Sequence, residues 1–335
     1  MRGLVDVLNP FFPLKEGRWL ILAFTFTSNI WCQQEQDSTI VSYSDKIALG
    51  LDMSTDIDEF IVNSPNVSNF HLVSNNDLKL TLKLNYKFLS LSAGFSPKFL
   101  PGNDDDDKKG ESSFTEYRFN LFPKRFVQSI FFRRMKGFYV ENTNDFVPNW
   151  NSAMDPYIQF PDLKSIAWGG YTGYVLNKNF SLRSLLNRQE WQRTSGGSLI
   201  PIISYEFTNM TNDFVDGSYG KENMVDLRAD LGYYFNWSIT QKFNLVLSVR
   251  AGIGPKFSKY TLDGVVERNH YFVVEYNTGL QLDYNSDKLY MGIAGSLNGY
   301  RYNGESSNNI SNNLWQGSFY IAYRIGAQEK LKQLF

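Results

Sequence analysis

The stretch DLKLTLKLNYKF (Asp77–Phe88) alternates apolar and polar residues almost without interruption. One set comprises Leu78, Leu80, Leu82, Leu84, Tyr86 and Phe88, and the other comprises Lys79, Thr81, Lys83, Asn85 and Lys87. Successive side chains of a β-strand point to opposite faces of the sheet. This period of two therefore predicts a strand with one apolar face and one polar face.

The same alternation recurs at 223–237, 243–254, 272–283 and 315–325. The apolar faces persist for about the nine to eleven residues that a tilted strand needs to cross a bilayer. The opposite faces mix charges of both signs with Gly and Ser, as a polar barrel interior does. A soluble sandwich also alternates, but these two features favour an all-β chain that forms a closed antiparallel transmembrane β-barrel. In such a barrel the lysines of the opening stretch become residues of the lumen or its rim.

Connection lengths predict the topology, because outer-membrane barrels pair short periplasmic turns with long external loops. Short turns are predicted at 122–125, 176–179, 240–242 and 284–287. Long polar connections are predicted around 98–112, 141–163, 208–222, 255–268 and 303–312. This spacing places six strands between about 44 and 177, and five between about 223 and 325.

The region between these two sets decides the strand count. It contains two strand-like segments, 179–190 and 197–208, but the topology requires an odd number of strands there. One strand gives twelve in total and three give fourteen. We predict twelve, with part of 187–198 folded into the lumen or forming a bulge, and fourteen is the alternative.

The N-terminus resembles a secretory signal, because basic residues precede the short apolar run WLILAFTF at 19–26. The run is too short and too rich in Thr for a spanning helix. Lipidation of Cys32 is the rival interpretation, although Trp31 stands where a lipoprotein signal has a small residue. The predicted organisation is a signal peptide at 1–32, a short N-terminal segment at 33–43, a β-barrel at 44–326 and a C-terminal tail at 327–335.

Composition limits the possible chemistry. The 33 basic and 34 acidic residues balance, so there is no bulk attraction for nucleic acid. The 27 Phe, 20 Tyr and 7 Trp suit a sheet protein, and Tyr and Trp suit membrane interfaces. Cys32 is the single cysteine and the chain has 2 His, too few ligands for a structural zinc site. We expect no metal and no cofactor.

Several segments resemble an uncharacterised family of outer-membrane β-barrels from Bacteroidota, which are Gram-negative bacteria. They are SDKIALGL (44–51), LNYKFLSLSAGFSPK (84–98), MKGFY (135–139), NKNFSLRSLLN (177–187) and RQEWQRTSGGSLI (188–200). The most specific part is Gln192 followed by Ser195–Ser198. The family is classed as a domain of unknown function. The resemblance therefore implies a barrel in the outer membrane and implies no activity.

Three motifs could carry chemistry, and each has a simpler explanation. His71 and His270 could serve a lipid-hydrolysing barrel, but neither lies in a pattern that places a serine and a carboxylate beside it. Asn103–Lys109 (NDDDDKK) lacks the ligand spacing of a calcium loop and is predicted to be a solvated loop. Ser195–Ser198 resembles a flexible glycine turn. A phosphate-binding loop would need a lysine and a helix after it, and neither is predicted there.

Charged residues on the polar strand faces are the candidate functional residues, and all are predicted to face the lumen. They are Glu116, Arg118, Asp226, Arg228, Asp230, Arg250, Glu275, Asp283 and Arg324. In a small barrel they would pair across the lumen and plug it, because unpaired buried charge is costly. With a continuous water path, opposed charges would instead create a transverse field that filters polar solutes.

The function predicted from the sequence is non-enzymatic, with no catalytic residue assigned. We expect a structural barrel or a narrow, porin-like passive channel in the outer membrane, with a charged polar lumen. Its expected partners are outer-membrane lipids, lipopolysaccharide and the barrel-insertion machinery. The alternatives are an acyl hydrolase-like barrel enzyme that modifies lipids, and a soluble periplasmic β-sandwich that binds an apolar ligand.

Overall fold

The computed structural model describes residues 39–55, 59–62, 70–214, 216–303 and 309–327. The predicted signal peptide and the predicted tail beyond Ala327 lie outside the described residues. In these ranges, no helix is both long enough and apolar enough to cross a membrane.

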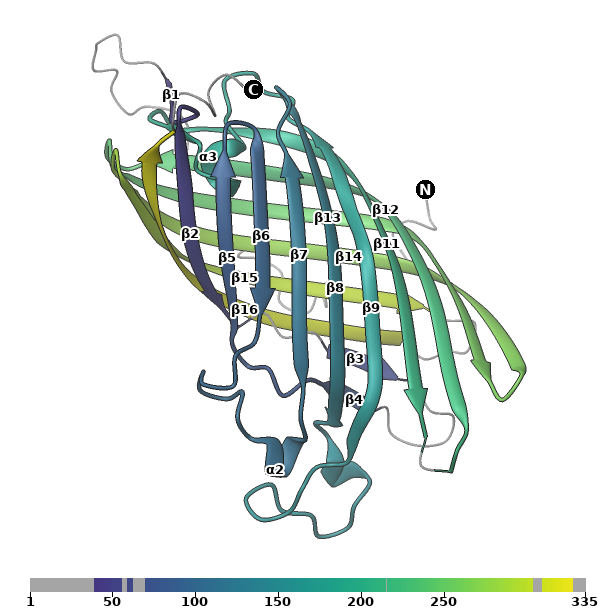
Figure 1. The fold of residues 1–335 in the computed structure, drawn as a ribbon. Helices are drawn as coiled ribbons and strands as arrows, with labels where there is room; N and C mark the ends of the chain where they lie inside the picture. The colour runs from purple at the N-terminus through teal and green to yellow at the C-terminus, as the bar shows by residue number, and fades with distance from the viewer. Residues whose placement is uncertain (1–38, 56–58, 63–69, 215, 304–308, 328–335) are drawn as a thin grey trace, which may run out of the picture. The chain divides into compact units, whose positions relative to one another are not determined.

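Twelve antiparallel strands of the described chain form one closed ring (Figure 1). Around the ring they are β8 (Phe126–Val140), β7 (Ser113–Leu121), β6 (Leu89–Phe95), β5 (Lys79–Tyr86), β2 (Lys46–Ser54), β16 (Asn309–Gly326), β15 (Leu289–Asn303), β14 (Val265–Asn285), β13 (Phe243–Leu262), β12 (Tyr219–Ser238), β11 (Gly196–Asp213) and β9 (Gln159–Tyr174). Pairing of β8 with β9 closes the ring, and pairing of β16 with β2 joins its last strand to its first. The predicted all-β barrel of twelve strands is confirmed, and both the fourteen-stranded alternative and the β-sandwich are wrong.

The alternation that opened the sequence builds β5. Leu82 and Leu84 lie exposed on the outer face, while Lys79 and Asn85 are buried on the inner face and Lys83 is half-buried there. Lys83 thus lies between two exposed leucines, as the pleat of a strand requires. The period of two is therefore the pattern of a barrel wall with an apolar exterior.

The two ends of the barrel differ in their connections. At one end, called here the short-turn end, β-strands are joined by 87–88, 122–125, 239–242 and 286–288. At the other, the long-loop end, the connections are 55–78, 96–112, 141–158, 214–218, 263–264 and 304–308. The long-loop connections contain β3 (Glu59–Val62), β4 (Phe70–Val73), α2 (Asp106–Lys109) and η1 (Thr143–Asp145), and β4 adds to the end of β8.

Two predicted long connections, 208–222 and 255–268, are wrong because most of their residues are strand. β12 and β13 each have 20 residues and β14 has 21, against 8 in β5 and 7 in β6. The turn between β13 and β14 is only Asp263 and Gly264, both with positive φ. Beyond the apolar band both faces of these hairpins meet water, so the backbone pairing continues while the alternation disappears.

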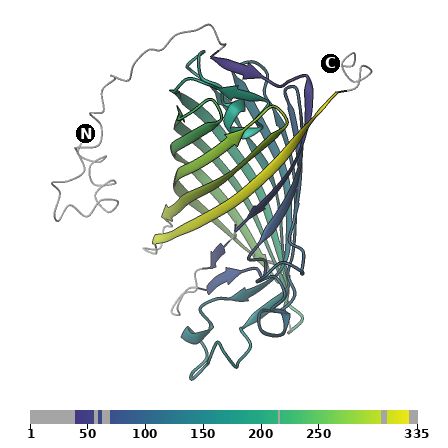
Figure 2. The same cartoon turned by 90° about the vertical axis from the view of Figure 1, so that its left-hand side faces the viewer.

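The predicted short turn at 176–179 is also wrong. The connection between β9 and β11 spans 175–195 and contains α3 (Arg183–Leu186) and β10 (Glu190–Gln192). β10 pairs with β1 (Ile40–Ser42) in a separate two-stranded sheet. We call Phe180–Gln192 the inserted segment, because α3 lies within the ring of strands at the short-turn end (Figures 1 and 2). The prediction that part of 187–198 leaves the wall is confirmed for 187–192, whereas Gly196–Ser198 begin β11.

Candidate functional site in the barrel interior

The structure places all nine candidate charges on the inner face of the wall. Asp226, Asp230, Asp283 and Arg324 are buried, and the other five are half-buried. Their strand neighbours point outward: Leu227 and Leu231, for example, flank these positions on β12 and are exposed. The strand pleat sets this separation, since a side chain next to an outward-facing residue must point to the interior.

One group of interior charges lies on β2, β5, β7 and β8. Lys83 forms an ion pair with Asp52. Glu116 forms two, with Arg118 and with Arg133, each at 3.0 Å. Asp52 lies on the polar face of an alternating segment, so the pattern that identifies Glu116 also identifies Asp52. The inner face of β8 is otherwise mostly apolar, so alternation does not identify Arg133.

A second group lies on β12 to β15. Arg228 pairs with Asp226, and with Glu275 at 2.9 Å. Arg250 also pairs with Glu275, at 2.7 Å. The Tyr300 hydroxyl donates to Asp226 at 3.2 Å. These contacts neutralise the charges along one side of the ring.

The interior ion pairs of both groups join residues of the same wall, instead of crossing the lumen as expected for a small barrel. Arg250 and Glu275 lie on adjacent strands, for example, and Arg118 and Glu116 lie on the same strand. Twelve strands about 4.8 Å apart and tilted by about 40° enclose a backbone cylinder roughly 24 Å across. Direct pairing across that width is out of reach for most opposed side chains. Closure of the lumen therefore needs additional chain.

The inserted segment supplies that chain at the short-turn end. Its Phe180, Leu182 and Leu185 are buried in one apolar cluster that includes inward residues of the wall. Those wall residues are Val127 of β8, Ile200 and Ile202 of β11, and Val246 of β13. At roughly 1.5–3 kcal/mol for each large apolar side chain, burial of the three segment residues contributes about 4.5–9 kcal/mol. An apolar core thus packs inside the mouth.

The other side of the inserted segment is polar and centres on Arg188. Its Nη2 lies 3.4 Å from the Asp283 Oδ1, and its guanidinium stacks 4.3 Å from the Tyr320 ring centroid. Tyr320 donates to the same carboxylate, and Arg324 donates to the Arg188 carbonyl at 2.7 Å. Burial lowers the pKa of Arg188, but Tyr320 and then Asp283 raise it by more, so the net pKa lies above its ordinary value. Two of the predicted residues, Asp283 and Arg324, therefore bind the inserted segment.

Hydrogen bonds tie the rest of the inserted segment to separate parts of the ring. Gln189 donates to the Asn85 carbonyl of β5 at 3.2 Å, and Trp191 donates to the Gln241 carbonyl at 3.0 Å. The Asn244 amide of β13 donates to the Gln192 carbonyl at 2.9 Å. Because these contacts reach distant strands, the segment spans the mouth instead of lying along one wall.

The long-loop end has its own apolar cluster. It joins Leu72 of β4 to inward residues of the wall, namely Phe114, Met135, Leu163 and Met210. The charged interior therefore lies between an apolar cluster at each end. This second cluster depends on the β4 segment, whose position the alternation pattern did not predict.

The other candidate motifs take structural positions. His71 is in β4, where its backbone N–H donates to the Asn142 side chain, and His270 is on β14 with its ring 5.3 Å from that of Phe257. Asp106 of the acidic run accepts from Asn75 and pairs with Lys98, so the predicted solvated loop is partly ordered by these contacts. In the described part of the chain, no group of three or more His, Cys, Asp and Glu could hold a metal ion.

The fold and interior define a twelve-stranded β-barrel with an inserted segment packed inside one mouth. The chain belongs to the family described as Domain of unknown function (DUF4421), whose model matches residues 35–325. No curated protein matches it significantly.

Several solved outer-membrane proteins are similar to the chain in structure, at low identity. The outer membrane protease OmpT from Escherichia coli aligns at 7% identity and a TM-score of 0.29, covering 85% of this chain and 96% of OmpT. The beta domain of the Bordetella autotransporter BrkA aligns at 11% identity and a TM-score of 0.37, covering 84% and 100%. A mutant of the monoaromatic hydrocarbon channel TodX aligns at 10% identity and a TM-score of 0.33, covering 84% and 90%. TM-scores this low support no inference about function.

Proposed function

We propose that the protein is a non-enzymatic outer-membrane barrel whose lumen is closed at the periplasmic end by the inserted segment. It is a structural barrel in this state, and solutes cross only when the segment is displaced. The observation that carries this proposal is the insertion of Phe180–Gln192 into the mouth, with an apolar core on one side and the buried Arg188 contacts on the other.

The exterior supports the membrane position. Large apolar residues are exposed on the outer face of strand after strand, among them Leu51, Leu82, Ile130, Leu199, Leu231, Val249, Leu280 and Ile321. Soluble monomers rarely expose a continuous apolar surface of this size. Short turns then face the periplasm and long loops face outward, as in outer-membrane barrels generally. Export and insertion by the barrel-insertion machinery of a Gram-negative bacterium, as the Bacteroidota resemblance implies, belong to the same proposal.

The two histidines are the residues at which a non-enzymatic role can be tested. His71 lies in β4, which packs at the long-loop end, whereas His270 lies far along β14 on an outward position. A Ser–His mechanism needs a serine and an orienting carboxylate within hydrogen-bond reach of the imidazole. Replacement of both histidines is expected to leave any measured property of the barrel unchanged, and loss of a lipid-hydrolysing activity on that replacement would favour the enzyme instead.

Planar-bilayer recording tests the closure. The variant replaces 180–192 by a flexible Gly-Ser linker, and the matched control replaces the equally long stretch 144–156 of a long-loop connection. We expect a steady ohmic conductance for the 180–192 variant alone, with wild type and control silent. Heat-modifiable migration on gels checks that all three proteins fold. A wild-type protein that conducts as well as the 180–192 variant would show that the segment does not seal the lumen.

A further inference from the structure

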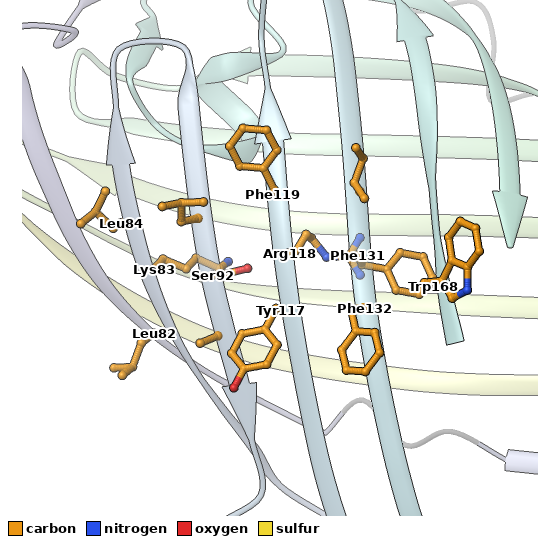
Figure 3. A pocket seen from close by; sticks show the side chains of 13 residues that line it. Leu82, Lys83, Leu84, Ser92, Tyr117, Arg118, Phe119, Phe131, Phe132 and Trp168 are labelled. Atoms are coloured by element: carbon orange, nitrogen blue, oxygen red, sulfur yellow. The ribbon is translucent and has the colours of Figure 1, made fainter. Parts of the chain in front are cut away.

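The outer face of β5 to β9 carries a shallow apolar depression. Its lining includes Leu82, Leu84, Tyr117, Phe119, Phe132 and Trp168 (Figure 3). Trp168 and Tyr117 are each more than half exposed. The depression lies on the side of the wall that faces lipid under the proposed function.

Towards the long-loop end this face changes from aromatic to basic. On β8 the outward positions run Phe132, Arg134, Lys136, and on β9 they run Trp168, Ile166, Lys164. Each step of two residues advances about 7 Å along a strand. The first cation therefore lies about 7 Å beyond the aromatic residues, and the lysines lie about 14 Å beyond them.

The cations are brought together by strand register. Lys136 lies directly opposite Lys164, and Arg134 lies directly opposite Ile166. Like charges at directly opposed positions destabilise a sheet, because their Cβ atoms are only about 5 Å apart. Asp162, 3.2 Å from Lys136, offsets one of the three charges. The cluster retains a net positive charge that an anion would neutralise.

A backbone irregularity fixes the position of these side chains. The register shifts between Lys136 and Phe138, where Gly137 has a φ of +80°. A Cβ on Gly137 would lie 1.9 Å from the Glu111 carbonyl oxygen, so no other residue fits. Bulges of this kind re-aim neighbouring side chains and are common beside functional positions.

We propose that this surface binds a phosphorylated, multiply acylated glycolipid of the outer leaflet. The phosphate lies against Arg134, Lys136 and Lys164, and an acyl chain lies in the depression beside Trp168. An amphiphile with these two parts matches a cationic cluster set about 7–14 Å beyond an apolar hollow. The inference rests on the proposed membrane position, which places the long-loop end in the leaflet that carries such lipids.

The test measures binding of lipid A to the full-length protein in neutral detergent micelles. The site variant is Arg134→Ala/Lys136→Ala/Lys164→Ala. The matched control removes three exposed lysines at the short-turn end, as Lys178→Ala/Lys242→Ala/Lys288→Ala. At about 1 kcal/mol for each basic residue, or about 5-fold in Kd, the site variant is expected to bind about 100-fold more weakly. The control is expected to bind as wild type does.

Two further measurements separate the sources of binding. Lipid A with brominated acyl chains is expected to quench wild-type tryptophan fluorescence, and Trp168→Phe is expected to remove most of that quenching. Dephosphorylated lipid A is expected to bind the wild-type protein and the site variant with the same low affinity. Equal losses in the site and control variants would overturn the proposal, as would unchanged affinity for the dephosphorylated lipid. Fractionation of the protein away from the outer membrane would instead refute the proposed function.

Discussion

Substitution of Arg188 by Ala is expected to loosen the inserted segment without unfolding the ring. The change removes the guanidinium that lies 3.4 Å from Asp283 and stacks on Tyr320. Breaking a buried ion pair costs about 3–5 kcal/mol, because the remaining charge is left buried and uncompensated. The Asp283 carboxylate keeps its hydrogen bonds from Tyr320 and Gln281, so we expect the lower figure, about 3 kcal/mol. That is about a 150-fold shift towards the displaced segment, at about 1.36 kcal/mol per tenfold.

Amide hydrogen exchange measures this shift where it occurs. The reporting amides are those of Tyr43, Arg188 and Arg193, which donate to carbonyls within or beside the inserted segment. They are expected to exchange about 150-fold faster in Arg188→Ala, while amides of the ring keep their wild-type rates. The double variant with Asp283→Asn removes the stranded charge and is expected to recover a large part of the loss. Unchanged exchange at these amides in Arg188→Ala would refute the role assigned to the ion pair.

Three further outcomes follow from the wall and its turns. Gly137→Ala is expected to lower the free energy of unfolding in urea by more than about 2 kcal/mol, because the added Cβ would overlap the backbone. Gly264→Ala is expected to cost about 1 kcal/mol, because no atom lies near its added Cβ and only the strain of a positive φ remains. Leu82→Arg is expected to lower the free energy of unfolding in lipid vesicles by about 2–4 kcal/mol. Val265→Arg, which lies beyond the apolar band, is expected to lower it by about 0–1 kcal/mol. Equal losses for the two variants would argue against the membrane position. A hydrogen bond from Lys46 and the positive charge of Lys46 lower the pKa of Asp287. The ionised Asp287 carboxylate therefore stabilises the fold above the unfolded pKa of about 3.9, and this stabilisation is lost as pH falls through the folded pKa. The unfolding free energies of wild type and Asp287→Asn are therefore expected to differ at pH 7 and to converge as pH falls through the folded pKa.

The ring is predictable because the two faces of each wall strand differ in polarity. Leu82 and Leu84 lie on the outside of the barrel and Lys83 lies on the inside, so apolar and polar residues must alternate along the strand. The count of twelve followed from this pattern together with the odd number of crossings required between 179 and 222. Beyond the apolar band this constraint ends, which is why the pattern predicts loops where the ends of β11–β14 are strand.

The site was only partly predictable. Asp283 and Arg324 could be identified as inward charges, but their common partner Arg188 lies in a segment without periodicity. Arg188 and Asp283 are 95 positions apart in the chain. Their contact depends on how a segment outside the wall strands folds into the ring, and a local sequence pattern does not predict that.

The seal at the short-turn end has a consequence for the order of assembly. The inserted segment contacts Tyr43 near the start of the described chain and Arg324 near its end. The Arg324 contact needs the last strand, β16, and β10 needs β1 as its partner. The apolar side of the segment has a different requirement, because Phe180 and Leu185 pack on β8, β11 and β13, which belong to one continuous side of the ring. Completion of the ring therefore fixes the polar side of the segment, and under the proposed function a finished barrel is a closed one.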